Sequence, residues 1–181
     1  MRQAVLISIK PTWCEKIASG EKTIEVRKTR PKLETPFTCY IYETKGYERV
    51  GNDNLNCVIG GKGRGMVIGE FVCNNIFTVY YDSYLRYGID YPNEYEKAIM
   101  EKSNLTLWEM LDYLNGKDGY AWVISDLKIY DEPKPITMFL RPCRNEGPCA
   151  FCKYAEIIPD EVLDCMNRVE RPPQSWCYVD V

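Results

Sequence analysis

The sequence predicts an α+β fold in which short strands and short helices share one core. Short apolar or alternating stretches bounded by Pro, Gly or Asn are typical of strands. Other segments begin with Pro or Thr and end near Gly, which is typical of helices. Strands are predicted at residues 5–9, 23–27, 38–42, 66–73, 77–81 and 120–130, and helices at 11–19, 92–102, 106–115 and 159–169. A chain of 181 residues can form one such domain with an appendage.

The first predicted helix has clear signals at both ends. Pro11 suits the first helical position because its φ is preset and it has no N–H to leave unpaired. Trp13 and Ile17 lie four residues apart and therefore share one face. Gly20 can adopt the left-handed conformation that ends a helix.

The helix that begins after Thr106 carries a capping box. In the run from Thr106 to Glu109, the hydroxyl and the carboxylate can each bond a backbone N–H that the helix leaves unpaired. Gly116 ends this helix, whose predicted core residues are Leu107, Met110, Leu111 and Leu114. The longest predicted strand follows, and we expect Pro133 and Pro135 to end it because Pro cannot continue a central ladder.

Composition excludes several classes of function. The chain has no histidine, so a catalytic Ser–His or Cys–His pair and histidine metal ligands are excluded. No apolar run is long enough to cross a membrane or to form a signal-peptide core, so we expect a cytoplasmic protein with no membrane partner. The net charge of −3 argues against tight nonspecific binding to long nucleic acids. Residues 1–65 nevertheless carry a net charge of +5, which permits a local positive patch.

The stretch from Gly20 to Lys28 joins a helix to a strand and is densely charged. Side chains alternate along a strand, so Ile24 and Val26 share one face while Glu25 and Arg27 share the other. One interpretation is a structural ion pair on a half-buried strand. The other is a cluster that faces a ligand, with a phosphate or a base edge in front of Arg27 and Lys22.

This stretch resembles the signature of a known family. Gly20-x-Lys22-x-x-Glu25-x-Arg27 is similar to the G-x-K-x-x-E-x-R motif of ASCH domains. The segments 65–71 (GMVIGEF) and 120–127 (YAWVISDL) resemble two further strands of that family, in the same order. The resemblance implies a PUA-like β-barrel of about five to six strands flanked by short helices. It implies an ASCH domain at residues 1–137. Residues 138–181 differ in composition, and we expect them to form a Cys-rich extension that packs on this domain.

The resemblance also implies a function, because PUA-like domains are generally associated with RNA. We therefore expect an RNA- or nucleotide-binding protein with a charged cleft built around Lys22, Glu25 and Arg27. Lys62 and Arg64 would contact phosphate from the loop at residues 60–65, whose closely spaced glycines expose backbone N–H groups. A flexible hairpin linker with two solubilising charges explains the same loop.

Enzymatic activity is the alternative. Some small ASCH proteins are amidohydrolases that remove the acetyl group of N4-acetylcytidine, using a Lys, a Thr and a Glu; others are reported as ribonucleases. Lys22 matches the lysine, but Glu25 stands at the threonine position and Ser103 lies near the glutamate position. A variant enzyme would use Lys22 with a lowered pKa, and Glu25 or Glu70 for proton transfer.

The C-terminal segment is rich in cysteine. Cys149 and Cys152 form a C-x-x-C pair, a spacing that lets two thiolates bind one tetrahedral ion. Cys143 is a third candidate ligand, and Cys177 or Cys165 the fourth. Such an all-sulfur site would hold a structural zinc or an iron–sulfur cluster. Free thiols in a packed tail are the competing interpretation, because a single C-x-x-C often occurs by chance in a chain with nine cysteines.

Overall fold

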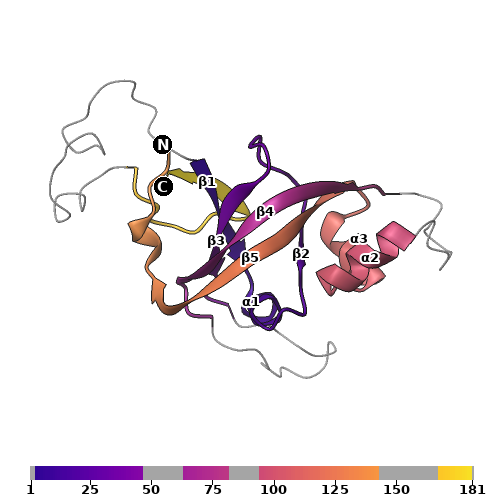
Figure 1. Ribbon diagram of the computed structural model, residues 1–181, viewed down its shortest axis with the longest axis horizontal. Coiled ribbons are helices and arrows are strands. Elements are labelled where there is room, and N and C mark those ends of the chain that lie inside the picture. Colours follow the sequence, from indigo (N-terminus) through magenta and orange to yellow (C-terminus); the bar gives the residue numbers. More distant parts are fainter. Residues whose placement is uncertain (1–2, 47–62, 82–93, 143–166, 181) are drawn as a thin grey trace, which may run out of the picture.

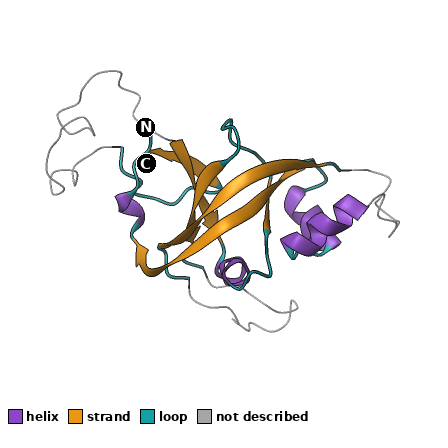
Figure 2. Cartoon of the chain, in the orientation of Figure 1, coloured by secondary structure: helices purple, strands orange, loops and turns teal. Residues whose placement is uncertain are grey.

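The computed structural model describes residues 3–46, 63–81, 94–142 and 167–180 (Figure 1). A single six-stranded sheet forms the centre, and the helices lie around it (Figure 2). The elements are β1 (Gln3–Ile9), α1 (Pro11–Ala18), β2 (Ile24–Arg27), β3 (Phe37–Glu43), β4 (Val67–Val79), α2 (Glu94–Ser103), α3 (Leu107–Leu114), β5 (Gly119–Lys134), the 3₁₀ turn η2 (Ile136–Met138) and β6 (Trp176–Asp180). The predicted α+β class is confirmed. No helix among these residues is long and apolar enough to span a membrane.

The strand order is β2-β5-β4-β3-β1-β6, with β1 and β3 parallel and the other neighbours antiparallel. The expected closed barrel is wrong for the described residues, because β2 and β6 remain the two edges of an open sheet. β2 has only four residues, and a side chain of β2, not its backbone, makes the contact with β1. The Arg27 guanidinium donates to the Ser8 carbonyl of β1 at 2.7 Å, where a closed barrel would have a backbone ladder.

Two strands are longer than predicted. The stretches predicted at 66–73 and 77–81 form one strand, β4. The pairs Cys73–Ile124 and Ile76–Trp122 show an extra residue on β4, so Asn74 and Asn75 lie in a β-bulge that bends the strand without ending it. β5 continues through Pro133 to Lys134, which pairs with Val67 at the end of the ladder.

The helix ends follow the expected chemistry. Pro11 opens α1, and Gly20 has a φ of +80° just after it. Both bonds of the predicted capping box at Thr106 and Glu109 are present. The left-handed residue that ends α3 is Asn115, one position before the predicted Gly116, which also has a positive φ. The helix predicted at 159–169 lies almost entirely outside the described residues.

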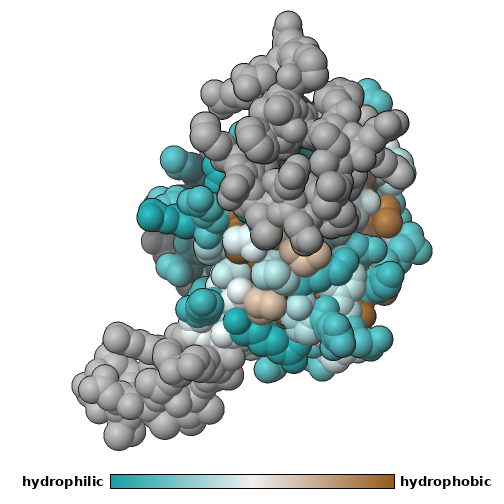
Figure 3. Space-filling model, turned by 90° about the vertical axis from the view of Figure 1, so that its left-hand side faces the viewer, coloured by the Kyte–Doolittle hydropathy of each residue, from teal (hydrophilic) through white to brown (hydrophobic). Residues whose placement is uncertain are grey.

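The sheet separates three apolar clusters. The largest lies between β1, α1, β3, β4 and β5 and contains Trp122, Phe71 and Ile7. A second cluster on the other face includes Val169 and Val179, so the C-terminal residues contribute to the core as well as to the sheet. The division of the chain at residue 137 stays a prediction. The face that carries both termini is mostly hydrophilic where described, with hydrophobic residues in separate spots (Figure 3).

The third cluster places β2. Ile24 and Val26 pack on one side of this strand against Met110 and Leu114 of α3 and Ile99 of α2. These two helices lie together at the end of the sheet that is remote from the chain termini (Figure 1). The predicted alternation is confirmed, but all four residues of β2 are buried, so Glu25 and Arg27 are not on a solvated face.

Gly69 provides a test of this packing, because β4 and β5 approach closely there. A Cβ at this position would lie 2.5 Å from the Lys128 carbonyl oxygen and 3.1 Å from the Ile129 Cα. These are backbone atoms that cannot move aside cheaply, so Gly69→Ala should lower the free energy of unfolding by about 2 kcal/mol in urea titrations. Gly46→Ala is the control, because its Cβ would meet nothing closer than 3.9 Å. Equal stability of the two variants would contradict the tight approach of these strands.

Candidate functional site

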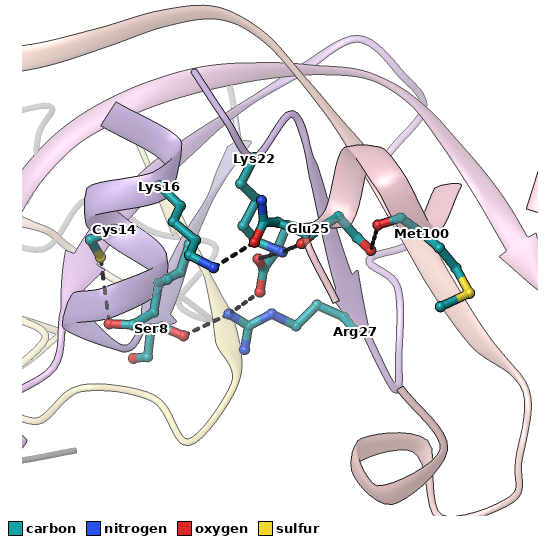
Figure 4. A network of polar contacts seen from close by, with 10 residues as sticks. Ser8, Cys14, Lys16, Lys22, Glu25, Arg27 and Met100 are labelled. Carbon is teal, nitrogen blue, oxygen red and sulfur yellow. Dashed lines mark hydrogen bonds and ion pairs between the residues drawn. The ribbon is translucent and has the colours of Figure 1, made fainter. Parts of the chain in front are cut away.

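Lys22, Glu25 and Arg27 form one buried ionic cluster, as Figure 4 shows. Lys22 Nζ lies 3.3 Å from Glu25 Oε2, and Arg27 Nη2 lies 2.9 Å from Glu25 Oε1. The three residues are only 2 %, 7 % and 6 % exposed. Glu25 therefore uses both carboxylate oxygens to hold two cations in a nearly dry environment, where charges are costly unless they are paired.

The C-terminal end of α2 fixes the lysine of this cluster. Lys22 Nζ donates to the Ser103 carbonyl at 2.7 Å, and the Thr23 N–H donates to the Lys102 carbonyl at 2.9 Å. The last carbonyls of a helix have no intrahelical partner and lie at the negative end of its dipole, so a buried ammonium group is stabilised there. The Trp13 ring, 5.0 Å from Nζ, adds a cation–π contact.

Arg27 connects the edge strand β2 to β1 and to the residue before β6. Its guanidinium donates to the Ser8 carbonyl and makes a longer contact of 3.4 Å with Ser175 Oγ, just before β6. The Tyr113 hydroxyl also lies near this guanidinium. Burial raises the pKa of Tyr113, and the charge of Arg27 opposes that rise.

Two buried N–H donors beside the cluster have no hydrogen-bond partner among the described residues. They are Arg27 Nε and Trp122 Nε1. Trp122 pairs directly with Glu25 across β2 and β5, so its side chain lies on the same face as Glu25 and Arg27. Buried polar groups are almost always paired, which makes two unpaired donors on one face of the sheet unusual.

The electrostatics of the cluster favour a neutral lysine more than is usual. Burial lowers the pKa of Lys22, and the attraction of Glu25 only partly opposes this effect. Nearby Cys14 behaves in the opposite sense: burial raises its pKa, and the charges of Glu43 and Glu25 add to the rise. Its thiol contacts the Ile9 carbonyl and stays protonated, so it is a packing residue and not a nucleophile.

Two other predicted site residues, Glu70 and Arg64, make their contacts outside this cluster. Glu70 accepts a hydrogen bond from the Tyr130 hydroxyl and pairs across strands with Tyr40, which packs against the second apolar cluster on the other face of the sheet. The Arg64 side chain is exposed, and its backbone N–H donates to Glu43 Oε2 at 2.7 Å. Lys62 lies outside the described residues.

The cysteine site stays a prediction. Cys143, Cys149, Cys152 and Cys165 lie outside the described residues. Cys177 is a half-buried free thiol on β6, and burial raises its pKa. Within the described part of the chain, no group of three or more Cys, Asp or Glu side chains is arranged to hold a metal ion.

Sequence reasoning missed several partners of the cluster. The carbonyls of Ser8 and Ser103 bind through the backbone, and a backbone acceptor leaves no mark in a sequence. Trp122 belongs to one of the motif strands, so the sequence placed it in the fold. The sequence could not predict that its indole N–H would be buried without a hydrogen-bond partner. Ser175 comes from the far end of the chain, with no local signal that it meets Arg27.

The dependence of both cations on Glu25 can be measured. Glu25→Gln would leave Lys22 and Arg27 buried without their counter-ion, so the free energy of unfolding should fall by about 3 kcal/mol in urea titrations. Glu21→Gln is the matched control at an exposed position four residues earlier, with an expected change within about 0.5 kcal/mol. If the two variants were equally stable, the carboxylate would not be what holds the cluster.

Comparison with solved structures finds the same fold in the ASCH protein of Zymomonas mobilis. A serine-to-alanine mutant of that protein superposes with a TM-score of 0.58 and 17% identity, covering 99% of this chain and 89% of that one. A tyrosine-to-phenylalanine mutant gives 0.55 and 19%, covering 99% and 91%. A structure described only as ASCH gives 0.52 and 20%, covering 98% and 87%. At these identities the likeness shows the fold alone.

No curated protein matches the chain. The sequence profile of the ASCH domain matches residues 7–113, which is more than half of the 181 residues. This range includes the whole Lys22–Glu25–Arg27 cluster and the first two of the three motif strands. The chain therefore belongs to the ASCH domain family, as the three sequence motifs predicted.

Proposed function

We propose that this protein binds a nucleoside, a nucleotide or a short single-stranded RNA at the Lys22–Glu25–Arg27 cluster. The observation that carries the proposal is the presence of buried donors without acceptors, Arg27 Nε and Trp122 Nε1, beside a cluster with two cations and one anion. A ligand with oxygen acceptors and negative charge supplies what the cluster lacks. Membership of a family generally associated with RNA supports this class of ligand.

The aromatic surroundings favour a ligand with a base. Trp13 lies over Lys22 Nζ, and the Trp122 and Trp176 rings lie 6.0 Å apart beside Arg27. Aromatic side chains that stack on unpaired bases are the usual partners of phosphate-binding cations in proteins that bind single strands. The acidic net charge of −3 favours a short ligand over a long duplex.

We place the charged cleft between the outer edge of β2 and β1. These two strands are not paired in the sheet, and the Arg27 side chain links them by donating to the Ser8 carbonyl. A ligand entering here would meet Arg27 first and Lys22 behind Glu25. Contacts of Arg64 and Lys62 with phosphate stay a prediction.

Binding can be tested with a matched pair of arginines. Labelled single-stranded RNA and the four ribonucleoside monophosphates would be titrated at low and moderate salt. Arg27→Lys keeps the charge but loses the planar fork, so its Kd should rise at least about tenfold. Arg30→Lys, an exposed position three residues later, should change the Kd less than about twofold.

Two results would speak against the binding site. Equal affinity of the wild type and the Arg27→Lys protein would remove Arg27 from the interface. A wild type that binds neither RNA nor any of the nucleotides would end the proposal altogether.

A hydrolase acting on a modified nucleoside such as N4-acetylcytidine, or on RNA, is the second candidate. The observation in its favour is the lowered pKa of Lys22, since a neutral amine can accept a proton from water or from a ribose hydroxyl. Glu25, in contact with Lys22, would carry that proton to the leaving group. Glu70 lies on the other face of the sheet, which leaves Lys22 and Glu25 as the residues for this chemistry.

The hydrolase candidate predicts a titration and a product. The Lys22 side chain, observed by ¹³C NMR at Cε, should lose its proton at lower pH than exposed lysines do, because burial disfavours the ammonium form. Glu25→Gln should lower that pKa further, since the carboxylate stabilises the charged form.

Lys22→Met should abolish cytidine release from N4-acetylcytidine, while Lys28→Met at an exposed position should not. Absence of cytidine and of RNA cleavage products with the wild type would leave binding as the function.

A further inference from the structure

The two orphaned donors define what the ligand must offer. We propose that Arg27 Nε and Trp122 Nε1 form a subsite that binds one exocyclic carbonyl oxygen of a base. This inference rests on the proposed function and adds the chemical group that the site selects. It places the recognition of the base at Trp122, a residue that no sequence motif assigns to a ligand.

The first step of the argument is position. Arg27 pairs with Tyr120 and Glu25 pairs with Trp122 in the antiparallel ladder of β2 and β5. Arg27 and Trp122 are therefore diagonal neighbours on one face, a separation that long side chains span easily. Both also contact the segment before and within β6, Arg27 at Ser175 and Trp122 at Trp176.

The second step is the cost of leaving these groups unpaired. A buried N–H without an acceptor lowers the stability of a fold, and two such groups are a substantial burden for a small domain. The neighbouring acceptors serve other groups. Glu25 holds Lys22 and Arg27 through its two oxygens, the Ser8 carbonyl holds Arg27 Nη2, and Ser175 Oγ accepts from Arg27 Nη1. Arg27 Nε and Trp122 Nε1 have no partner among the described residues.

The third step is the identity of the acceptor. A carbonyl oxygen has two lone pairs and can accept from two donors at once, whereas a ring nitrogen has one. An indole N–H is neutral and its ring is apolar, and Trp122 is fully buried against Phe37 and Trp176. These surroundings suit the flat edge of a base better than a phosphate. Uracil, cytosine and guanine carry exocyclic carbonyls, and adenine does not.

The ligand reaches this subsite along the segment at residues 170–175. This segment has no regular secondary structure and is largely exposed. Its contact with the cluster, from Arg27 Nη1 to Ser175 Oγ at 3.4 Å, is longer than the contacts of Arg27 with Ser8 and Glu25. The segment is also tied to β1, because the Ser8 N–H donates to the Ser175 carbonyl at 2.9 Å and the Ser8 hydroxyl donates to the Pro173 carbonyl at 2.7 Å. Entry of the ligand therefore requires these two bonds to open, which would uncover the guanidinium next to Trp122.

The test compares nucleotides that have the carbonyl oxygen with nucleotides that lack it. UMP, CMP, GMP and AMP would be titrated into the wild-type protein, and AMP should bind at least about tenfold more weakly than the best of the others. Sulfur accepts hydrogen bonds poorly, so replacing the recognised carbonyl oxygen by sulfur (2-thio-UMP, 4-thio-UMP, 2-thio-CMP or 6-thio-GMP) should weaken binding about tenfold. Trp122→Phe should reduce this oxygen-to-sulfur ratio to less than about threefold.

Two controls keep the test decisive. Trp108→Phe removes the same N–H from a side chain that is 76 % exposed, and it should leave the ratio unchanged. Ribose 5-phosphate reports binding through phosphate alone and should bind more weakly than the best nucleotide. If Trp122→Phe does not fold, the thio-nucleotide series on the wild type decides the question.

Several outcomes would overturn the subsite. They are AMP binding as tightly as the best nucleotide, thio-nucleotides binding as tightly as their oxygen parents, or ribose 5-phosphate accounting for the full affinity. An oxygen-to-sulfur ratio unchanged by Trp122→Phe would remove Trp122 from the site. Each of these results leaves nucleotide binding intact. A wild type that binds no nucleotide and no RNA instead ends the proposed function, and the subsite with it.

Discussion

The carboxylate of Glu25 is the interaction on which the rest of the structure depends. It bonds Lys22 on one side and Arg27 on the other, and each cation then reaches a separate part of the fold. Lys22 holds the C-terminus of α2, and Arg27 holds β1. One buried acid thus links the helical end of the molecule to the far strands of an open sheet. Removing its charge would leave both links without a counter-ion.

Such a cluster is a costly way to hold a fold together. Removing three charges from water carries a desolvation cost of several kcal/mol per ion, and apolar side chains of similar volume often give equal or better stability. The opposite face of β2 uses apolar packing instead, since Ile24 and Val26 pack this strand against α2 and α3. The charged face needs a different explanation, and recognition of a polar ligand is one that also accounts for its orphaned donors.

The sequence predicted the local features that depend on local chemistry. Alternation along β2, the cap of α1 at Gly20 and the capping box at Thr106 each follow from neighbouring residues, and each is confirmed. The extent of burial was not predictable in this way. Glu25 and Arg27 were equally consistent with a solvated face, because what covers them comes from Ser8, Trp122 and Ser175, all distant in sequence.

The open sheet has the same kind of cause. The residues of β2 do not predict that its outer edge stays without a neighbouring strand and that its own Arg27 side chain makes the contact with β1 instead. The bulge at Asn74 and Asn75 similarly depends on the pairing of β4 with β5, so the sequence alone predicted two strands where there is one. Where the partner is a backbone carbonyl or a distant strand, the sequence identifies the residue and the structure identifies its role.

The balance of donors and acceptors connects these observations to function. Two buried N–H donors on the face of Glu25, Arg27 Nε and Trp122 Nε1, are in excess of the acceptors that the described residues offer them. A structural ion pair has no need of such an excess, because every additional buried donor lowers stability. A binding site does need it, since the ligand supplies the missing acceptors. The surplus on the face of Glu25 is thus a stronger argument for a ligand than the charges themselves, which an ion pair would explain.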